Sequence, residues 1–253
     1  FDTGQSGLVA RNASLLGVDL SAVRAVALSH GHYDHTGGLR AVWEKAPDAR
    51  LFVHPSALVP RFSRRPGGAA RAVGTDPLTL QAIRCREADV VETRSVTAVL
   101  PGVFLTGEIP RVTEYEDVGG PFVLDEAGIR PDPIVDDQAM FFDTAEGIVV
   151  LLGCAHAGVV NTLRHIRHLG GGRPIRAVLG GMHLLVASAE RMSRTVEALR
   201  SLDARQLCPA HCTGAAATAR LWQEFPGSCG TCSVGDRFAY KKWAIIKKIN
   251  YLA

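Results

Sequence analysis

The chain has 253 residues and a formal net charge of +3, from 28 Lys and Arg against 25 Asp and Glu. Four of the positive charges belong to Lys241, Lys242, Lys247 and Lys248, and removing them leaves a net charge of −1 for the rest of the chain. A surface that binds nucleic acid needs clustered positive charge, and this balance argues against one. No apolar run reaches the roughly 20 residues of a membrane helix. The six cysteines are too few for a disulfide scaffold, so we expect a protein of the reducing cytoplasm.

The length is typical of one α/β domain, which we predict over residues 1–240. The tail over residues 241–253 differs in composition, because Lys45 is the only lysine before it. We interpret the tail as an appended or read-through segment, and the alternative is a short amphipathic helix that touches a membrane or a partner. The chain starts at Phe1 without an initiating Met, in a segment typical of a strand that runs into a turn. We therefore expect the chain to be truncated at its N-terminus.

The first third of the chain alternates short apolar runs with glycine-bearing turns, which predicts alternating helices and strands. The expected elements are a helix over 8–16, a buried strand over 23–28, a helix over 39–45 and a strand over 51–53. Functional residues of layered α/β folds collect in the loops that follow strands. The turn after residue 28 is therefore the first candidate for a functional site.

That turn contains three imidazoles and one carboxylate within six residues, His30, His32, Asp34 and His35. Imidazole nitrogen and carboxylate oxygen are ligands of zinc, manganese and iron, and a turn lets alternate side chains point at two adjacent ions. The alternative is a solvated histidine-rich turn or an affinity tag, but tags are uninterrupted histidine runs at chain ends. The strand before the motif and the glycine pair after it favour a divalent-metal site.

Three later apolar runs, which we predict to be strands, each lead into a histidine at a glycine- or proline-bearing turn. These histidines are His156, His183 and His211, and a helix is predicted over 159–169. Core packing does not explain a histidine at the same topological position several times, so we expect all three to join the metal site. His54 also follows a strand, but a single histidine there is more often structural. We assign it at most a role in supporting the ligands.

Two segments without regular patterning interrupt these elements. Residues 61–77 are rich in Arg, Gly and Pro and predict a surface loop, whose arginines are solvated or meet a phosphorylated substrate; solvation is the preferred interpretation. These arginines are Arg61, Arg64, Arg65 and Arg71. Apolar runs over 90–105 predict an antiparallel meander. Residues 106–137 form a proline-rich, acidic insertion, which is typical of a lid or a dimer contact.

Seven strings occur in order along the chain: FDTGQSG, LSHGHYDHTGGL, LTGEIPR, DDQA, GCAHAGVVN, GGMHL and HCTG. Together they resemble the metallo-β-lactamase fold superfamily. Within it they resemble a branch that includes archaeal 7,8-dihydropterin-6-methyl-4-(β-D-ribofuranosyl)-aminobenzene-5'-phosphate synthases. The resemblance implies an α/β fold, an αββα sandwich, whose N-terminal hairpin is missing from this chain.

By this resemblance the motifs supply ligands for two divalent ions, with zinc preferred and manganese or iron as alternatives. The first ion would be held by His30, His32 and His156, and the second by Asp34, His35 and His211. Asp2 would support the ligands from beneath the site. Most of the superfamily has a bridging Asp where this chain has Gly180-Gly181-Met182-His183. His183 is the preferred replacement for it, and Cys212 is the rival.

The resemblance also implies a metal-dependent enzyme that acts on a small molecule, as a hydrolase or a dihydropterin-type transferase. In hydrolysis a metal-bound hydroxide would attack and Asp34 would carry the proton; in the transfer the ions would hold a diphosphate leaving group. Glu108 and Arg111 are expected contacts for a substrate that is phosphorylated or a pterin. The alternatives are a non-catalytic small-molecule binding protein or sensor and a nucleic-acid hydrolase of the same superfamily. We expect no nucleic-acid or membrane partner, and residues 106–137 could form a homodimer contact.

Overall fold

The computed structural model describes residues 1–64 and 67–241. Their contacts divide the chain into two compact units, the first made of Phe1–Arg94 and Gly120–Asp136 and the second of Ser95–Gly119 and Asp137 onwards. Each unit has its own sheet and its own hydrophobic core. Residues 242–253, which carry most of the predicted cationic tail, lie outside the described residues.

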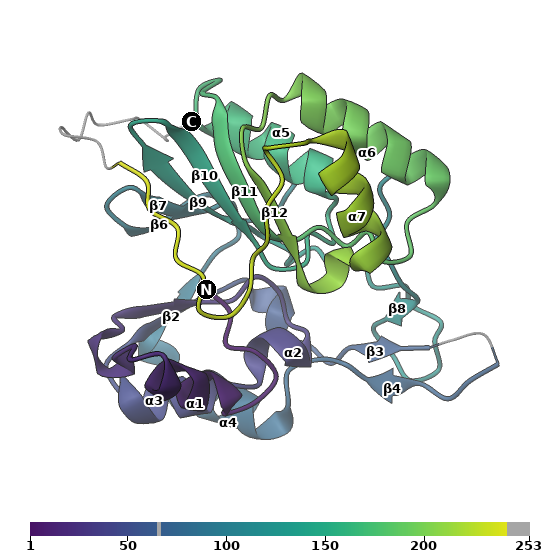
Figure 1. Ribbon diagram of the computed structural model, residues 1–253. Coiled ribbons are helices and arrows are strands. Elements are labelled where there is room, and N and C mark those ends of the chain that lie inside the picture. The colour runs from purple at the N-terminus through teal and green to yellow at the C-terminus, as the bar shows by residue number, and fades with distance from the viewer. Residues whose placement is uncertain (65–66, 242–253) are drawn as a thin grey trace. The chain divides into compact units, whose positions relative to one another are not determined.

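The first unit is built around three parallel strands in the order β1-β2-β5, of which β2 is labelled in Figure 1. The strands are β1 (Ala25–Ala27), β2 (Arg50–Val53) and β5 (Val90–Glu92), and the α-helices are α1 (Leu8–Leu15), α2 (Tyr33–Thr36), α3 (Leu39–Lys45) and α4 (Pro77–Arg84). Short 3₁₀ helices lie between them, at η1 (Leu20–Ala22), η2 (Pro55–Leu58) and η3 (Glu87–Asp89). Parallel pairing requires a crossover, and α3 and α4 provide it.

Helix α3 shows how this core forms. Leu39, Val42 and Trp43 are buried in one cluster with Leu51 of β2. Their i, i+3, i+4 spacing places them on one face of the helix, and the predicted helix over 39–45 is confirmed. The expected meander over 90–105 is wrong at β5, which pairs in parallel with β2 because α4 brings the chain back to the same sheet.

The first unit also contains a small antiparallel sheet in the order β4-β3-β8. Its strands are β3 (Phe62–Ser63), β4 (Arg71–Ala72) and β8 (Phe122–Val123). Phe62 pairs with Ala72 on one side and with Val123 on the other. The surface loop predicted over 61–77 is therefore wrong in part, because strands of two residues are set by their partners and leave no periodicity in the sequence.

The second unit contains a six-stranded mixed sheet in the order β12-β11-β10-β9-β7-β6 (Figure 1). Its strands are β6 (Thr97–Leu100), β7 (Val103–Leu105), β9 (Met140–Thr144), β10 (Gly147–Leu152), β11 (Ile175–Gly181) and β12 (Leu207–Ala210). Its helices are α5 (Val159–Leu169), α6 (Ala189–Ser201), η4 (His211–Thr213) and α7 (Ala215–Glu224). The predicted strands that lead to His156, His183 and His211 and the predicted helix over 159–169 are confirmed.

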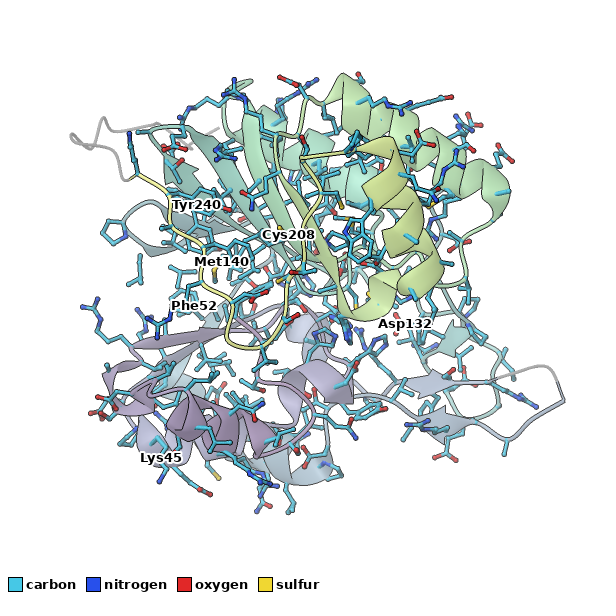
Figure 2. The ribbon with its side chains drawn as sticks, viewed as in Figure 1. Lys45, Phe52, Asp132, Met140, Cys208 and Tyr240 are labelled. Atoms are coloured by element: carbon cyan, nitrogen blue, oxygen red, sulfur yellow. The ribbon has the colours of Figure 1, made fainter. Side chains whose placement is uncertain are left out.

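Alternation along β10 separates the two faces of this sheet. Ile148, Val150 and Leu152 belong to the larger core, which also contains the apolar sides of α5, α6 and α7. Val149 faces the other side, in a smaller cluster with Cys208 and the partly buried Tyr240. Figure 2 shows the labelled Cys208 and Tyr240 on this unit. The three helices therefore cover one face, and the segment that follows α7 contributes to the other.

The parallel strands β10, β11 and β12 are neighbours, so their carboxyl ends share one edge of the sheet. Leu152 pairs with Gly180, and Gly181 pairs with Ala210. The turns that carry His156, His183 and His211 leave from this edge. No helix among the described residues is long and apolar enough to cross a bilayer.

Candidate metal centre

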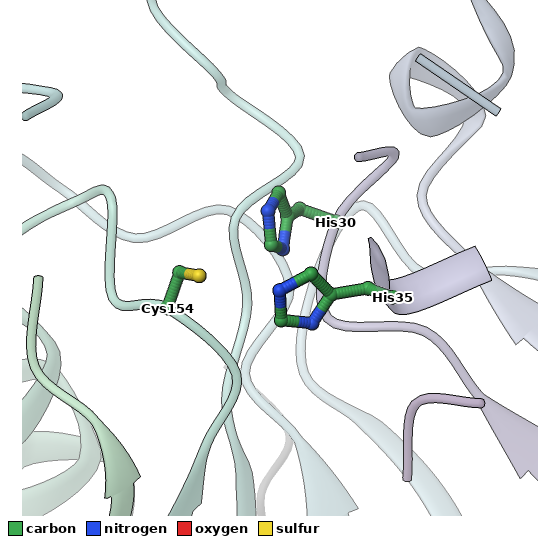
Figure 3. Close-up of side chains that lie close together, drawn as sticks. All are labelled: His30, His35 and Cys154. Atoms are coloured by element: carbon green, nitrogen blue, oxygen red, sulfur yellow. The ribbon is translucent and has the colours of Figure 1, made fainter. Parts of the chain in front are cut away.

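In the first unit, the turn after β1 places three imidazoles together in the protein interior. His30, His32 and His35 are all buried. Nε2 of His30 lies 2.9 Å from Nδ1 of His32, and the ring centroids of His30 and His35 are 4.2 Å apart. Figure 3 shows the rings of His30 and His35 beside each other. Two ring nitrogens that converge in this way either share a proton or point their lone pairs at a common ion.

Asp34 and His35 form a second pair of donor atoms in the same turn. Oδ2 of Asp34 lies 3.6 Å from Nε2 of His35, and the Asp34 side chain is 33% exposed. The one-turn helix α2 fixes this geometry, because Asp34 and His35 are successive residues within it. The turn thus offers one pair of nitrogens and one mixed oxygen and nitrogen pair.

Asp2 anchors this turn from the N-terminal segment. Its Oδ2 lies 2.7 Å from Nδ1 of His35 and accepts from the Ser29 hydroxyl at 2.8 Å, and its Oδ1 accepts from the Ser29 N–H at 2.7 Å. Burial acts to raise the pKa of Asp2, but His35 and the Ser29 hydrogen bonds outweigh it and lower the pKa. A carboxylate only accepts, so Nδ1 of His35 carries a proton; in the neutral imidazole Nε2 then has the lone pair.

Asp136 and Arg61 hold the same turn, and neither was predicted to do so. Oδ2 of Asp136 accepts from the Gly31 N–H at 2.8 Å, and its Oδ1 accepts from Nη2 of Arg61 at 2.5 Å. Arg61 is 1% exposed, so the expectation of a solvated arginine is wrong at this position. The sequence gives little indication of this contact, because Arg61 and Asp136 are 75 positions apart.

His54 lies at the start of η2 and is buried. Its Nδ1 accepts from the Ser56 N–H at 3.1 Å, so it caps this 3₁₀ helix. This contact gives His54 a structural role in the first unit. Its predicted role in supporting the ligands stays a prediction.

In the second unit, His156 follows β10 and is 1% exposed. Its Nδ1 donates to the Val118 carbonyl oxygen at 2.8 Å, which leaves Nε2 as the nitrogen with a lone pair. Asp137 supports the turn, because its Oδ2 accepts from the Ala157 N–H at 2.7 Å. Arg111 contacts the same turn by donating from Nη1 to the His156 carbonyl oxygen at 2.8 Å, whereas Glu108 is exposed.

Glu116 fixes the segment that carries Val118. Its Oε1 accepts from the Val160 N–H at 2.9 Å, and its Oε2 accepts from the Asn161 N–H and the Thr113 hydroxyl, also at 2.9 Å. These N–H groups belong to the first turn of α5, where helices lack internal acceptors. The segment predicted as an irregular insertion is therefore tied to the helix that follows His156.

His183 and His211 both have a left-handed backbone, with φ of 47° and 50°. Nε2 of His183 lies 3.2 Å from the Gly119 carbonyl oxygen. A Cβ at position 119 would come within 1.8 Å of the His183 ring, so only glycine fits there. His211 begins η4 and is exposed.

Cys154, His183 and Cys212 form a compact cluster in the second unit, and their ligand-capable atoms all lie within 4.8 Å of one another. Sγ of Cys212 is 3.5 Å from the Cys154 carbonyl oxygen, to which a protonated thiol would donate. The Cys154 thiol and then His183 favour the thiolate and lower the pKa of Cys212 to about 4. Burial acts to lower the pKa of His183, but Cys212 outweighs it and the net pKa is raised. Cys154, labelled in Figure 3, was not predicted as a metal ligand, because a single buried cysteine is usually a packing residue.

Comparison with known proteins identifies the class to which these features belong. A family model described as the metallo-beta-lactamase superfamily matches residues 1–211. The chain is 30% identical over 220 residues to the 7,8-dihydropterin-6-methyl-4-(beta-D-ribofuranosyl)-aminobenzene-5'-phosphate synthase of Methanocaldococcus jannaschii, a match that covers 85% of this chain and 74% of that protein. It is 29% identical over 224 residues to an uncharacterized protein of the same organism, with 88% and 82% covered.

A solved structure gives the same result. The crystal structure of Tm1679, described as a metal-dependent hydrolase of the beta-lactamase superfamily, is 30% identical, has a TM-score of 0.80 and covers 96% of this chain and 88% of that one. The chain belongs to the metallo-β-lactamase superfamily, and the predicted fold class is confirmed.

Proposed function

We propose that this chain is a metal-dependent enzyme that converts a small molecule at a centre with two divalent ions. The proposed ligands of the first ion are His30, His32 and His156, and those of the second are Asp34, His35 and His211. Zinc is the preferred ion, with manganese or iron as alternatives, because imidazole and carboxylate suit all three. His183 is a further proposed ligand.

The observation that carries this proposal is the fixed orientation of two buried imidazoles. Nδ1 of His35 lies on the Asp2 carboxylate at 2.7 Å, and Nδ1 of His156 lies on the Val118 carbonyl oxygen at 2.8 Å. Ligating histidines in metal sites almost always donate their other ring N–H to such an acceptor. Each contact places the ring proton on Nδ1, which is the tautomer that coordinates an ion through Nε2.

The donor atoms of the first unit also suit the proposed ions. The His30 and His32 nitrogens converge at 2.9 Å, and the Asp34 oxygen and the His35 nitrogen at 3.6 Å. Ligands bound about 2.0–2.2 Å from a tetrahedral zinc lie at comparable separations. Both pairs therefore need little movement to accept an ion.

Divalent ions bound there supply Lewis acidity, which acidifies water and polarises a carbonyl or phosphoryl oxygen. In our proposal, the carboxylate of Asp34 accepts the proton of the nucleophile, and its partial exposure gives it access to a substrate. Asp2 holds His35 through the reaction, and Asp136 holds the Gly31 N–H and hence the turn. Arg111 and Glu108 are the proposed substrate contacts.

Two reaction types are supported by different similarities. The name of the Methanocaldococcus relative favours a synthase reaction that joins a dihydropterin to an aminobenzene phosphate, for which we propose diphosphate as the leaving group. The description of Tm1679 favours hydrolysis. A phosphorylated substrate fits the first unit, because the exposed Arg71 donates to the Tyr33 hydroxyl at 2.8 Å and so places a cation beside the histidine turn. We propose a small, phosphorylated or pterin-type substrate and no nucleic acid.

The test uses the purified chain loaded separately with zinc, manganese or iron. Turnover is measured on a panel of phosphoesters and lactones, and diphosphate release is measured from a dihydropterin methyl diphosphate with an aminobenzene phosphate. We expect activity that depends on metal, and a loss of about 10²-fold or more in kcat for Asp34→Asn, since general acid–base groups contribute 10²–10⁴-fold. Asp48→Asn, an exposed aspartate of the same unit, is the control.

Binding of metal without turnover of any substrate would favour the binding protein or sensor instead. Activity that is equal in the wild type and in Asp34→Asn would overturn the assigned role of Asp34. Failure of the folded chain to bind any of the three metals would overturn the proposal as a whole.

A further inference from the structure

We propose that Cys154, His183 and Cys212 form a second kind of metal site, a Cys₂His zinc site with one open coordination position. All three residues belong to the second unit. The site goes beyond the proposed function and does not rest on its two ligand sets. Cys154 and Cys212 belong to neither set, and His183, given above as a further ligand, is assigned to this site instead. The metal it would take is a thiophilic divalent ion, with zinc as the natural candidate.

The fold brings the three side chains together from separate strands. Cys154 follows β10, His183 follows β11 and Cys212 follows β12, and these strands are adjacent and parallel. Their ligand-capable atoms lie within 4.8 Å of one another. A tetrahedral zinc with bonds of about 2.3 Å to sulfur and 2.0–2.1 Å to nitrogen requires a similar, slightly tighter arrangement. Small side-chain rotations would close the difference.

The orientation of His183 favours this site over a bridging role between two other ions. Its Nε2 lies 3.2 Å from the Gly119 carbonyl oxygen, which can only accept a hydrogen bond. Nε2 therefore carries a proton, and Nδ1 is the ring nitrogen that can supply a lone pair to an ion. An imidazole with one lone pair can bind a single ion. Because the ligand-capable atoms of His183 and Cys212 lie within 4.8 Å of each other, that ion would lie beside the thiol.

The neighbouring backbone keeps space for the cluster. Gly181 lies beside it, and a Cβ there would come 2.8 Å from Sγ of Cys212 and 2.3 Å from the Gly153 carbonyl oxygen. The site is also shielded, because Cys154 is 4% exposed and His183 and Cys212 are half-buried. Two thiols and one imidazole in such surroundings select zinc over the oxygen-preferring ions. Three protein ligands leave the fourth position to water or a substrate atom.

Cobalt(II) tests this assignment, because it replaces zinc and reports thiolate ligands by a sulfur-to-cobalt charge-transfer band in the near ultraviolet. The fully reduced full-length chain is titrated with cobalt(II) alone. We expect the band to appear, to fall by about half in Cys154→Ser and in Cys212→Ser, and to vanish in the double variant, since each thiolate contributes separately. Cys232→Ser, a half-buried cysteine of the same unit, should leave the band unchanged.

A measurement on the unmodified chain covers the case in which a variant does not fold. Zinc should slow alkylation of Cys154 and Cys212, mapped by peptide mass spectrometry, and leave alkylation of Cys232 unaffected. Absence of the cobalt band from the folded, reduced protein would overturn the site, as would equal alkylation with and without zinc. Persistence of the band in the double variant would also overturn it.

The outcome is separable from that of the proposed enzyme. Asp34→Asn should lower metal-dependent turnover by about 10²-fold or more and leave the charge-transfer band intact. If the enzyme proposal fails, the thiol site still predicts the band. If the thiol site fails, cobalt should still bind through nitrogen and oxygen without it.

Discussion

Strained backbone occurs at some residues of the candidate centre. Among the described residues, the non-glycine positions with positive φ include Asp2, Ala155, His183 and His211. A left-handed conformation at such residues costs of order 1–3 kcal/mol and persists where the surrounding contacts impose it. Ile134 and Asp203 share the conformation elsewhere, so strain alone does not define the site. At His183 and His211 it coincides with metal-capable side chains.

Asp2 provides a test at the scale of one residue. Asp2→Ala removes the acceptor that holds Nδ1 of His35, so the imidazole loses its fixed orientation. We expect the zinc affinity to fall by about 10–100-fold, the usual cost of losing such a partner. Competition with a chromophoric chelator measures the affinity, and circular dichroism checks the fold. Asp48→Ala is the control, and equal affinities in the two variants would contradict the role of Asp2.

Glu116 provides a test at the scale of an element, helix α5. Glu116→Ala leaves the Val160 and Asn161 N–H groups without their acceptor in a buried place. We expect the free energy of unfolding to fall by about 1–3 kcal/mol, the cost of an unsatisfied buried donor. Glu116→Gln retains one acceptor oxygen and should lose less. Urea denaturation measures both, and two variants as stable as the wild type would refute the capping role.

Helix α4 gives a pH-dependent test. The Asp76 carboxylate caps it by accepting from the Leu78 and Thr79 N–H groups at 3.1 and 3.0 Å. Burial acts to raise the pKa of Asp76, but the bonds from Thr79 and Leu78 and the charge of Arg40 outweigh it and hold the pKa below 3.8. A pKa lowered by folding adds stability above the unfolded-state value of 3.8, and this stability is lost as the pH falls through the folded-state pKa.

Asp76→Asn keeps a capping oxygen and removes the charge. We expect the wild type to be more stable than Asp76→Asn by about 0.3–1 kcal/mol at neutral pH, the usual value of an anion at a helix N-terminus. Urea denaturation at a series of pH values should show this difference shrinking below pH 3.8. A difference that does not change with pH would show that the charge is not responsible.

Elements with their own periodicity could be predicted from the sequence. Helices over 39–45 and 159–169 have apolar residues at helical spacing, and their bounds agree with the structure. Helix α4 was missed although Asp76 and Pro77 are a cap and a first-turn proline, because its flanks are rich in Arg, Gly and Pro. The partner of β5 could not be predicted, since strand pairing depends on residues far along the chain.

In the candidate site too, features with a local pattern could be predicted and long-range contacts could not. The histidines could be predicted because each follows a recognisable strand. Glu116, Asp136 and Arg61 act on residues 44, 105 and 75 positions away, and no local pattern records such contacts. Cys154 is two residues before His156, so its place in the GCAH string was visible, whereas its proximity to Cys212 was not.

At the scale of the whole molecule, the proposed ligands come from both units. His30, His32, Asp34 and His35 belong to the first, and His156, His183 and His211 belong to the second. Each unit orients its own histidines through a carboxylate or a backbone carbonyl. We therefore propose that the two ligand sets bind two ions in one folded chain.

A count of the bound ions tests this two-ion centre. Native mass spectrometry of the chain after zinc titration gives the number of ions per molecule, for the wild type and for His30→Ala with His35→Ala, which removes one ligand from each proposed set. We predict that the wild type binds two more zinc ions than the double variant. Zinc bound by Cys154, His183 and Cys212 would be present in both proteins and does not change this difference. Equal zinc content in the wild type and the folded double variant would overturn the proposed two-ion centre.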